Sequence, residues 1–163
     1  MQIIVKNKDT LLFEDFKFKC SVGKNGTTSS KTEGDKKTPK GTYFLGPVYF
    51  REDRILDLPT KLKKIRIKKN MGWCDDENSK FYNKLIKVNN RIKHEKLHRR
   101  SRDYDIIIPI KYNFTKIVKK KGSAIFLHLT KDYKKTLGCI TLKKKDMLIL
   151  LRLINKKTKI KII

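Results

Sequence analysis

Two side chains near the end of the chain are of the types that together activate a nucleophile. Cys139 is one of three cysteines and His128 is one of three histidines, and eleven positions separate them. A thiol and a base within hydrogen-bond reach form the minimal cysteine nucleophile. A neighbouring imidazolium lowers the thiol pKa, so that thiolate is present at neutral pH. The pair therefore predicts nucleophilic chemistry, with Cys139 as the attacking group and His128 as its base.

The pattern around this pair predicts the strands that position it. A short apolar strand ends at His128, and after a polar connection Gly138 and Cys139 open a second strand that returns to the same sheet edge. Alternation places Phe126 and His128 on one face and Leu127 on the other. Gly138 permits a positive φ and a close approach to substrate, so its amide and that of Cys139 are predicted to hold an oxyanion. The alternative is an inert core that buries the cysteine, since free cysteine is among the most buried residue types.

The same stretch resembles the catalytic motif of the L,D-transpeptidase catalytic domain family (YkuD type). That family carries an upstream His as base and a Ser-His-Gly-Cys block whose Cys is the nucleophile. Four residues match it: His128, Thr136 in the Ser position, Gly138 and Cys139. Leu137 stands where the family usually has a second His, Thr141 stands where an Arg often follows, and the gap from His to Cys is shorter than usual.

This resemblance implies acyl transfer on peptidoglycan. The Cys139 thiolate would attack the carbonyl of the diaminopimelate residue in a tetrapeptide stem, D-Ala would leave, and a thioester would form. An amine acceptor then gives a 3-3 crosslink, whereas water gives a trimmed tripeptide. Thr136 would face the substrate, and neither a metal nor an organic cofactor is required. The missing Arg at position 141 leaves recognition of the substrate carboxylate to other residues.

A polar segment between the predicted strands supplies candidate substrate contacts. The run Trp73-Cys74-Asp75 resembles part of an inserted cleft loop in a small-protein branch of the same family. Trp73 offers a flat apolar wall for a sugar or an alkyl stem, and Asp75 or Asp76 has the charge to bind an ammonium such as that of diaminopimelate. The alternative is a loop whose Trp caps the core and whose charges are solvated.

The second half of that segment carries groups suited to a carboxylate. His94 and Glu95 form the His-Glu pair of the same branch, and Arg99 or Arg100 follows. Because Arg binds carboxylates in a bidentate manner, we expect this group to replace the Arg absent at position 141. Two further residues are predicted to line the mouth of the cleft: Tyr112 and Asn113.

Hydrophobic periodicity along the whole chain predicts one domain, residues 1–163, that is mostly β (α+β). We expect a mixed-sheet, sandwich-like fold with a single C-terminal helix, as in the catalytic domain that the motif resembles. The predicted strands and helix are Gln2–Lys6, Phe16–Val22, Thr42–Leu45, 48–50, Lys63–Lys68, Tyr104–Ile110, the helix Lys143–Ile154, and Thr158–Ile163.

The net charge of +26, from 42 Lys and Arg against 16 Asp and Glu, suggests an alternative function, nucleic-acid binding. A basic domain without catalysis would bind nucleic acid with a salt-sensitive affinity. Lysine, isoleucine and asparagine are, however, abundant in every segment, as coding in an AT-rich genome would produce. The basic residues also form no single block with interleaved aromatics. We therefore expect weak polyanion binding and no specific nucleic-acid partner.

The number of cysteines and the N-terminal sequence indicate the cellular compartment in which the protein works. Cys20, Cys74 and Cys139 are odd in number and lack CxxC spacing, which argues against a disulfide framework or a zinc site. The apolar run Ile3–Val5 is too short for a signal peptide, and no stretch approaches a membrane span. These observations predict a cytoplasmic enzyme, or a periplasmic or cell-wall one if the sequence was trimmed. A cytoplasmic enzyme favours hydrolysis, an L,D-carboxypeptidase activity in muropeptide recycling, over crosslinking. Nothing in the sequence fixes the oligomeric state.

Overall fold

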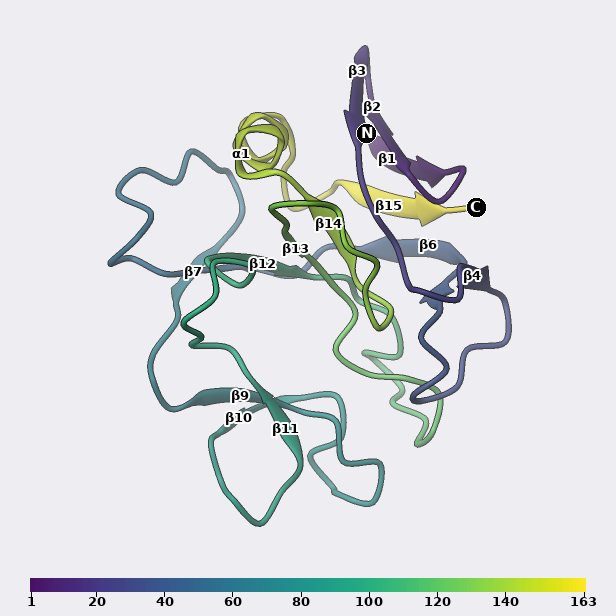
Figure 1. The fold of residues 1–163 in the computed structure, drawn as a ribbon, viewed down its shortest axis with the longest axis vertical. Coiled ribbons are helices and arrows are strands. Elements are labelled where there is room, and N and C mark those ends of the chain that lie inside the picture. The colour runs from purple at the N-terminus through teal and green to yellow at the C-terminus, as the bar shows by residue number, and fades with distance from the viewer.

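Two five-stranded sheets and one helix enclose the main core (Figure 1), in a computed structural model that describes all of residues 1–163. The first sheet has the order β3-β2-β1-β15-β6. Strands β1 and β15 are parallel, and all other neighbouring strands of this sheet are antiparallel. The strands are β1 (Gln2–Lys6), β2 (Thr10–Phe13), β3 (Phe16–Lys19), β6 (Gly41–Phe44) and β15 (Lys159–Ile162). The first and last strands of the chain are therefore neighbours. A strand at Thr10–Phe13 was not predicted.

The second sheet carries the catalytic motif. Its order is β14-β13-β12-β7-β8, with parallel pairs at both ends, β13–β14 and β7–β8. The strands are β7 (Val48–Phe50), β8 (Lys64–Arg66), β12 (Ile106–Pro109), β13 (Phe126–Leu129) and β14 (Ile140–Leu142). Every residue of β12 and β13 is buried, as the continuous apolar runs predict. The lysine-flanked β8 lies at the sheet edge, as its charges indicate. A two-stranded ribbon, β4 (Thr27–Thr28) and β5 (Thr38–Pro39), lies outside both large sheets.

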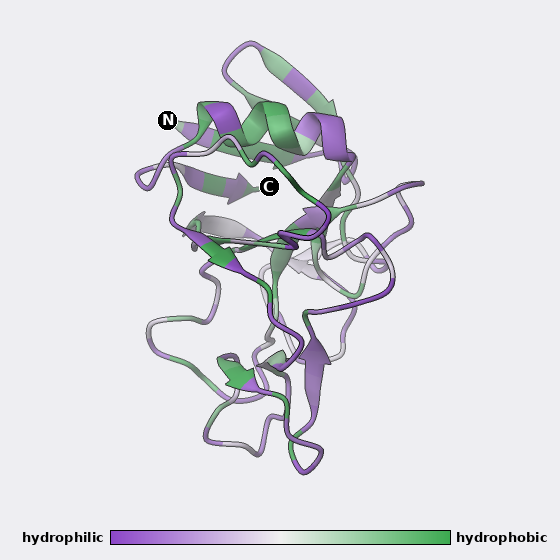
Figure 2. Cartoon of the chain, turned by 90° about the vertical axis from the view of Figure 1, so that its left-hand side faces the viewer, coloured by the Kyte–Doolittle hydropathy of each residue, from purple (hydrophilic) through white to green (hydrophobic).

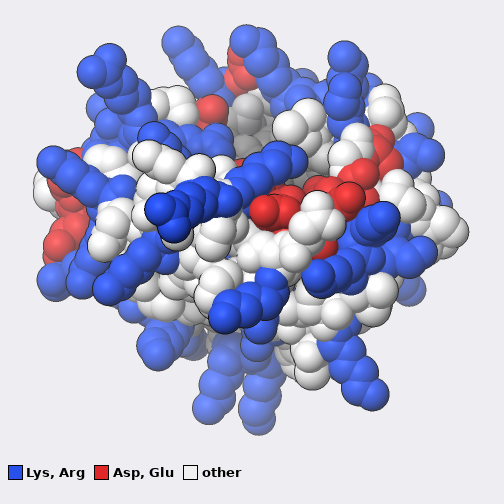
Figure 3. All heavy atoms as spheres, turned by 90° about the horizontal axis from the view of Figure 1, so that it is seen from below, with Lys and Arg blue, Asp and Glu red and all other residues white.

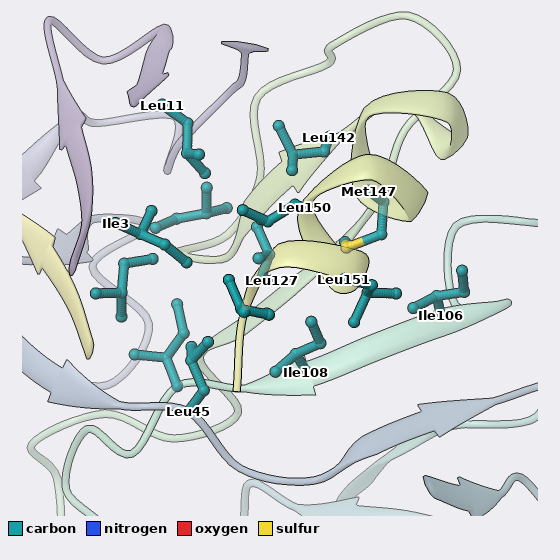
Figure 4. Close-up of a cluster of buried hydrophobic side chains, with 14 of the residues drawn as sticks. Ile3, Leu11, Leu45, Ile106, Ile108, Leu127, Leu142, Met147, Leu150 and Leu151 are labelled. Carbon is teal, nitrogen blue, oxygen red and sulfur yellow. The ribbon is translucent and has the colours of Figure 1, made fainter. Parts of the chain in front are cut away.

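Helix α1 (Lys144–Leu153) closes the main core. Its buried residues are Met147, Leu150 and Leu151, and they meet side chains of both large sheets, such as Ile3 and Leu127 (Figure 4). Polar and apolar residues alternate along α1 and the strands near it (Figure 2), so each element turns one apolar face inward. The mostly β, mixed-sheet fold with one C-terminal helix is confirmed.

A third sheet covers the other face of the second one. It has the order β10-β9-β11, formed by β9 (Met71–Cys74), β10 (Leu85–Lys87) and β11 (His94–Lys96), at the bottom of Figure 1. A second cluster of nine buried residues, including Trp73 and Phe126, fills the space beneath it. The sequence suggested a loop here, which is wrong. β10 and β11 are only three residues long, and β11 is entirely polar, so neither shows a hydrophobic alternation.

The connection between β13 and β14 also differs from the prediction. A strand that returned would be antiparallel, but β14 runs parallel to β13, with His128 in register with Thr141. The ten-residue connection folds back along the segment after β3, where Thr136 bridges Gly23 and Thr141 bridges Ser21. Because His128 pairs with Thr141 and Cys139 stands two positions before Thr141, His128 and Cys139 project from the same face of the sheet.

Candidate active site

Cys139 lies immediately before β14 and faces the third sheet. Its thiol donates to the carbonyl of Ala124 at 3.2 Å and accepts from the amide of Phe126 at 3.4 Å. Alternation in β14 sends Ile140 to the main core and leaves Cys139 in the second cluster. The sulfur is therefore held by the backbone that leads into β13, at the base of a cavity.

His128 is held so that one ring nitrogen remains available. Its Nδ1 lies 2.9 Å from the carbonyl oxygen of Leu129. A carbonyl can only accept, so Nδ1 carries the proton and Nε2 keeps its lone pair. His128 and Cys139 line the same cavity, and Cys139 stands two positions before Thr141, the residue paired with His128. The arrangement suits a general base beside a thiol.

The protonation state of this pair corrects the sequence-based prediction. Burial, with a smaller contribution from the Glu95 carboxylate, raises the pKa of the Cys139 thiol to about 12. Burial lowers the pKa of His128 to about 4. The pair therefore rests as neutral thiol and neutral imidazole at pH 7, and no imidazolium is present to stabilise a thiolate. The thiolate must form by proton transfer to Nε2 as the attack begins.

This resting state predicts the pH dependence of alkylation at Cys139. With the thiol pKa at about 12, the rate of carboxamidomethylation by iodoacetamide should rise about tenfold per pH unit from pH 8 to pH 10. Peptide mapping by mass spectrometry measures this rate separately from that of the other cysteines. A plateau reached below pH 8 would indicate a preformed thiolate–imidazolium pair and contradict the neutral assignment.

Gly138 shapes the turn before the nucleophile. Its φ is +148°, and an added Cβ would lie 3.0 Å from the carbonyl oxygen of Lys37, so glycine is required. Its amide already donates to Thr136 Oγ1 at 3.1 Å, and its carbonyl accepts from Thr38 Oγ1 at 2.7 Å. The predicted oxyanion role of Gly138 is corrected: its amide is engaged, whereas the amide of Cys139 has no hydrogen-bond partner within the protein.

Two cavities meet at the thiol. The larger, of about 800 Å³, extends on the His128 side, and the smaller, of about 170 Å³, extends on the Gly138 side. Four residues line both: Asp75, Glu95, Leu137 and Cys139. Leu137 is 71% exposed and stands between the two openings. A substrate can therefore extend from the thiol in two directions.

Comparisons with known proteins agree with this geometry. The family model described as the L,D-transpeptidase catalytic domain matches residues 2–162. The chain belongs to the L,D-transpeptidase catalytic domain family. The structure of Bdellovibrio bacteriovorus Bd1075 has the same fold, with a TM-score of 0.51 at 16% identity, over 99% of this chain and 46% of that one. The chain thus spans about half the length of Bd1075. No curated protein matches the sequence, and none of its helices is long and apolar enough to span a membrane.

Four of the predicted substrate contacts line the larger cavity. These residues are Asp75, His94, Glu95 and Thr136. Asp75 Oδ1 is buried without a hydrogen-bond partner, and burial raises the pKa of this carboxyl. Its only ion pair, with the Lys93 ammonium, is long at 3.8 Å. Asp75 is therefore the predicted residue whose buried oxygen lacks a partner and would be stabilised by a bound cation. Thr136 Oγ1 donates to the Cys139 carbonyl at 2.6 Å, which makes it a brace of the turn.

The predicted apolar wall is wrong. Trp73 is only 3% exposed and lines neither cavity. Its indole N–H donates to Asn83 Oδ1 at 2.9 Å, and its ring packs edge-on against Phe126. The alternative, a Trp that caps the core, describes it correctly, because β9 turns this side chain towards the second sheet.

Three other predicted contacts lie away from the site. Arg100 is exposed and lines no cavity at the thiol, where Arg99 takes its place. Tyr112 donates to the carbonyl of Lys121 at 2.5 Å, and Asn113 donates to the carbonyl of Val118 at 2.9 Å. Tyr112 and Asn113 line a separate depression of about 350 Å³. Neither residue lines a cavity at the thiol.

Sequence reasoning missed two groups that line the site. Tyr104 packs against His128, yet its place before an apolar run suggested only a strand residue. The connection after β13 brings three lysines to the larger cavity: Lys131, Lys134 and Lys135. Lysine is so frequent in this chain that these three carry no distinguishing signal. On the face in Figure 3, basic side chains are spread widely, and the acidic ones form a band from the centre to the right with a few more at the left edge and the top.

Proposed function

We propose that this L,D-transpeptidase-family protein is a cysteine acyl-transfer enzyme that cleaves the diaminopimelate–D-Ala bond of peptidoglycan tetrapeptides. One observation carries the proposal. Cys139 and His128 project from the same face of neighbouring strands into one cavity, and the Leu129 carbonyl leaves Nε2 free to take the thiol proton.

The reaction follows from these positions. Nε2 of His128 takes the proton of Cys139 while the sulfur attacks the substrate carbonyl. The free amide of Cys139 donates to the oxyanion that forms. The imidazolium then returns its proton to the leaving amine, D-Ala departs, and a thioester remains. Water or an amine attacks the thioester and restores the thiol.

The direction of the substrate is set by the proton donor. The leaving amine must meet Nε2, so D-Ala lies in the larger cavity on the His128 side. There Arg99 and the lysines after β13 supply cations for its carboxylate. Diaminopimelate then lies in the smaller cavity, where the unpartnered Asp75 oxygen accepts its ammonium. This assignment gives Arg99 the role of the Arg absent at position 141.

We propose hydrolysis, an L,D-carboxypeptidase activity, as the main fate of the thioester. Most residues around the larger cavity are polar, so water reaches the thioester from the side of the base. Lys131, Lys134 and Lys135 repel the protonated amine of an acceptor at this opening. Crosslinking is the second candidate, because a cavity of about 800 Å³ has room for a second stem peptide.

The products of a single reaction distinguish these fates. We expect purified protein incubated with disaccharide-tetrapeptide to yield disaccharide-tripeptide and free D-Ala, without dimers, by liquid chromatography and mass spectrometry. Triple replacement of Lys131, Lys134 and Lys135 by Gln should raise the dimer fraction if charge excludes the acceptor amine. Abundant 3-3 dimers from the wild-type protein would show that crosslinking is the main reaction.

A further inference from the structure

Tyr104 is a buried side chain in direct contact with the base. It is 5% exposed, and its ring meets that of His128 at 66°, with 5.0 Å between the ring centroids. A second edge contact, with Phe126 at 6.0 Å, fixes the other side of the phenol ring. Tyr104 therefore forms part of the wall that bounds the space open to the imidazole.

The third sheet holds Tyr104 in this place. Its hydroxyl donates to Glu95 Oε2, in β11, at 2.6 Å. The Arg99 guanidinium lies over the phenol ring, 3.7 Å from the centroid, and 3.4 Å from the same Glu95 oxygen. Arg99 is itself held, since its Nε donates to the Lys96 carbonyl at 2.8 Å. A largely buried carboxylate persists only when paired and hydrogen-bonded, so these contacts form one mutually dependent cluster.

Tyr104 is the aromatic ring that packs against the His128 imidazole. The hydrogen bond from Nδ1 to the Leu129 carbonyl sets the tautomer, and the Asp103 backbone is the other hydrogen-bonding group near the ring. Rotation about the Cβ–Cγ bond of a histidine is soft and roughly two-fold. A flipped ring would turn Nε2 away from Cys139 and leave the thiol without a base. The Tyr104 ring, with its centroid 5.0 Å from that of His128, bounds the space beside the imidazole.

We infer that Tyr104, held by Glu95 and Arg99, is a positioning residue that keeps Nε2 of His128 directed at Cys139. The inference rests on the proposed acyl-transfer function and adds a role for the third sheet. Through this cluster β11 acts on the chemistry without contributing the base or the nucleophile. Glu95 thereby holds Tyr104 in place in addition to lining the two cavities.

The inference is tested by a set of matched variants. Tyr104→Leu removes the ring contact, and Tyr104→Phe removes only the hydrogen bond to Glu95. Tyr49→Leu is the control, because Tyr49 is a buried tyrosine of the same cluster that packs on Trp73 and lines neither cavity. Melting temperatures show whether each variant is folded.

The positioning role predicts that kcat falls by a larger factor than KM rises, although KM also changes because the Tyr104 ring contacts Arg99. In Tyr104→Leu we expect kcat for tetrapeptide cleavage to drop about 10²-fold, the effect of a misplaced catalytic group. In Tyr104→Phe the fall should be about two- to tenfold, the size of one lost hydrogen bond. Tyr49→Leu should keep the wild-type kcat even where its melting temperature falls as far.

A measurement without substrate separates this inference from the proposed function. In ¹⁵N-detected spectra of the histidine rings, wild type and Tyr49→Leu should show His128 only as the Nδ1–H tautomer, and Tyr104→Leu should show averaged ring nitrogens. A folded Tyr104→Leu protein with the wild-type tautomer and kcat would overturn the inference. Should that variant fail to fold, wild-type kcat in Tyr104→Phe would overturn it equally. Wild-type protein that shows the tautomer pattern yet releases no D-Ala would refute the proposed function and leave the positioning of His128 standing.

Discussion

Replacement of Cys139 by serine is expected to abolish D-Ala release. A serine hydroxyl is not ionised near neutral pH, and burial has lowered the pKa of His128 to about 4, which makes it a weak base for an alcohol. We expect kcat to fall by a factor on the order of 10⁴ to 10⁶, as for other lost nucleophiles. The measurement is the rate of free D-Ala formation from disaccharide-tetrapeptide.

The other two cysteines supply the controls. Cys20 packs in the main core and Cys74 is fully buried in β9, and neither lines a cavity at the thiol. Cys20→Ser and Cys74→Ser should therefore keep most of the activity while losing some stability. A Cys139→Ser protein that turns over at the wild-type rate would remove Cys139 from the mechanism.

Replacement of His128 by alanine should give the second-largest loss. The imidazole takes the thiol proton and returns it to the leaving amine, so its removal should slow thioester formation by about 10²–10⁴-fold. Substrate affinity should change little, because Arg99 and Asp75 remain. Single-turnover measurements by rapid quench separate the acylation rate from binding.

A second histidine tests the assignment of the base. His94 lines the same cavity, and its Nδ1 lies 2.6 Å from the carbonyl oxygen of Ile92, so it too has a free Nε2. His94→Ala should leave the acylation rate near that of the wild type. An unchanged rate in His128→Ala, together with a large loss in His94→Ala, would transfer the role of base to His94.

Periodicity predicted the parts of the fold that bury one regular face. In the segment 124–129, Phe126 enters the second cluster while Leu127 and Leu129 enter the main core, as alternation indicates. The helix lies within one residue of its predicted bounds at each end. The third sheet escaped prediction because β11 reads His-Glu-Lys, and such a strand is specified by pairing with β9 and not by its own pattern.

In the candidate site, too, the sequence predicted some features, and others depend on how the chain packs. Residue types and spacing predicted Cys139 and His128, and the resemblance to a family motif supplied their roles. Their charge states could not be predicted, because burial under the third sheet sets both pKa values. Trp73 was misplaced for the same reason: a loop would expose it, whereas a strand of the third sheet buries it. Asp75 was predicted from charge alone, and its unpartnered oxygen now gives a physical reason for the assignment.

The central claim is that Cys139 becomes acylated by the stem peptide. Mass spectrometry of the intact wild-type protein, quenched in acid during turnover of disaccharide-tetrapeptide, tests it most directly. The account predicts a species heavier by the mass of the substrate less D-alanine, with the adduct mapped to Cys139 by peptide digestion and absent from Cys139→Ala. Folded protein that releases D-Ala without this adduct, or that carries the adduct on another residue, would contradict the account.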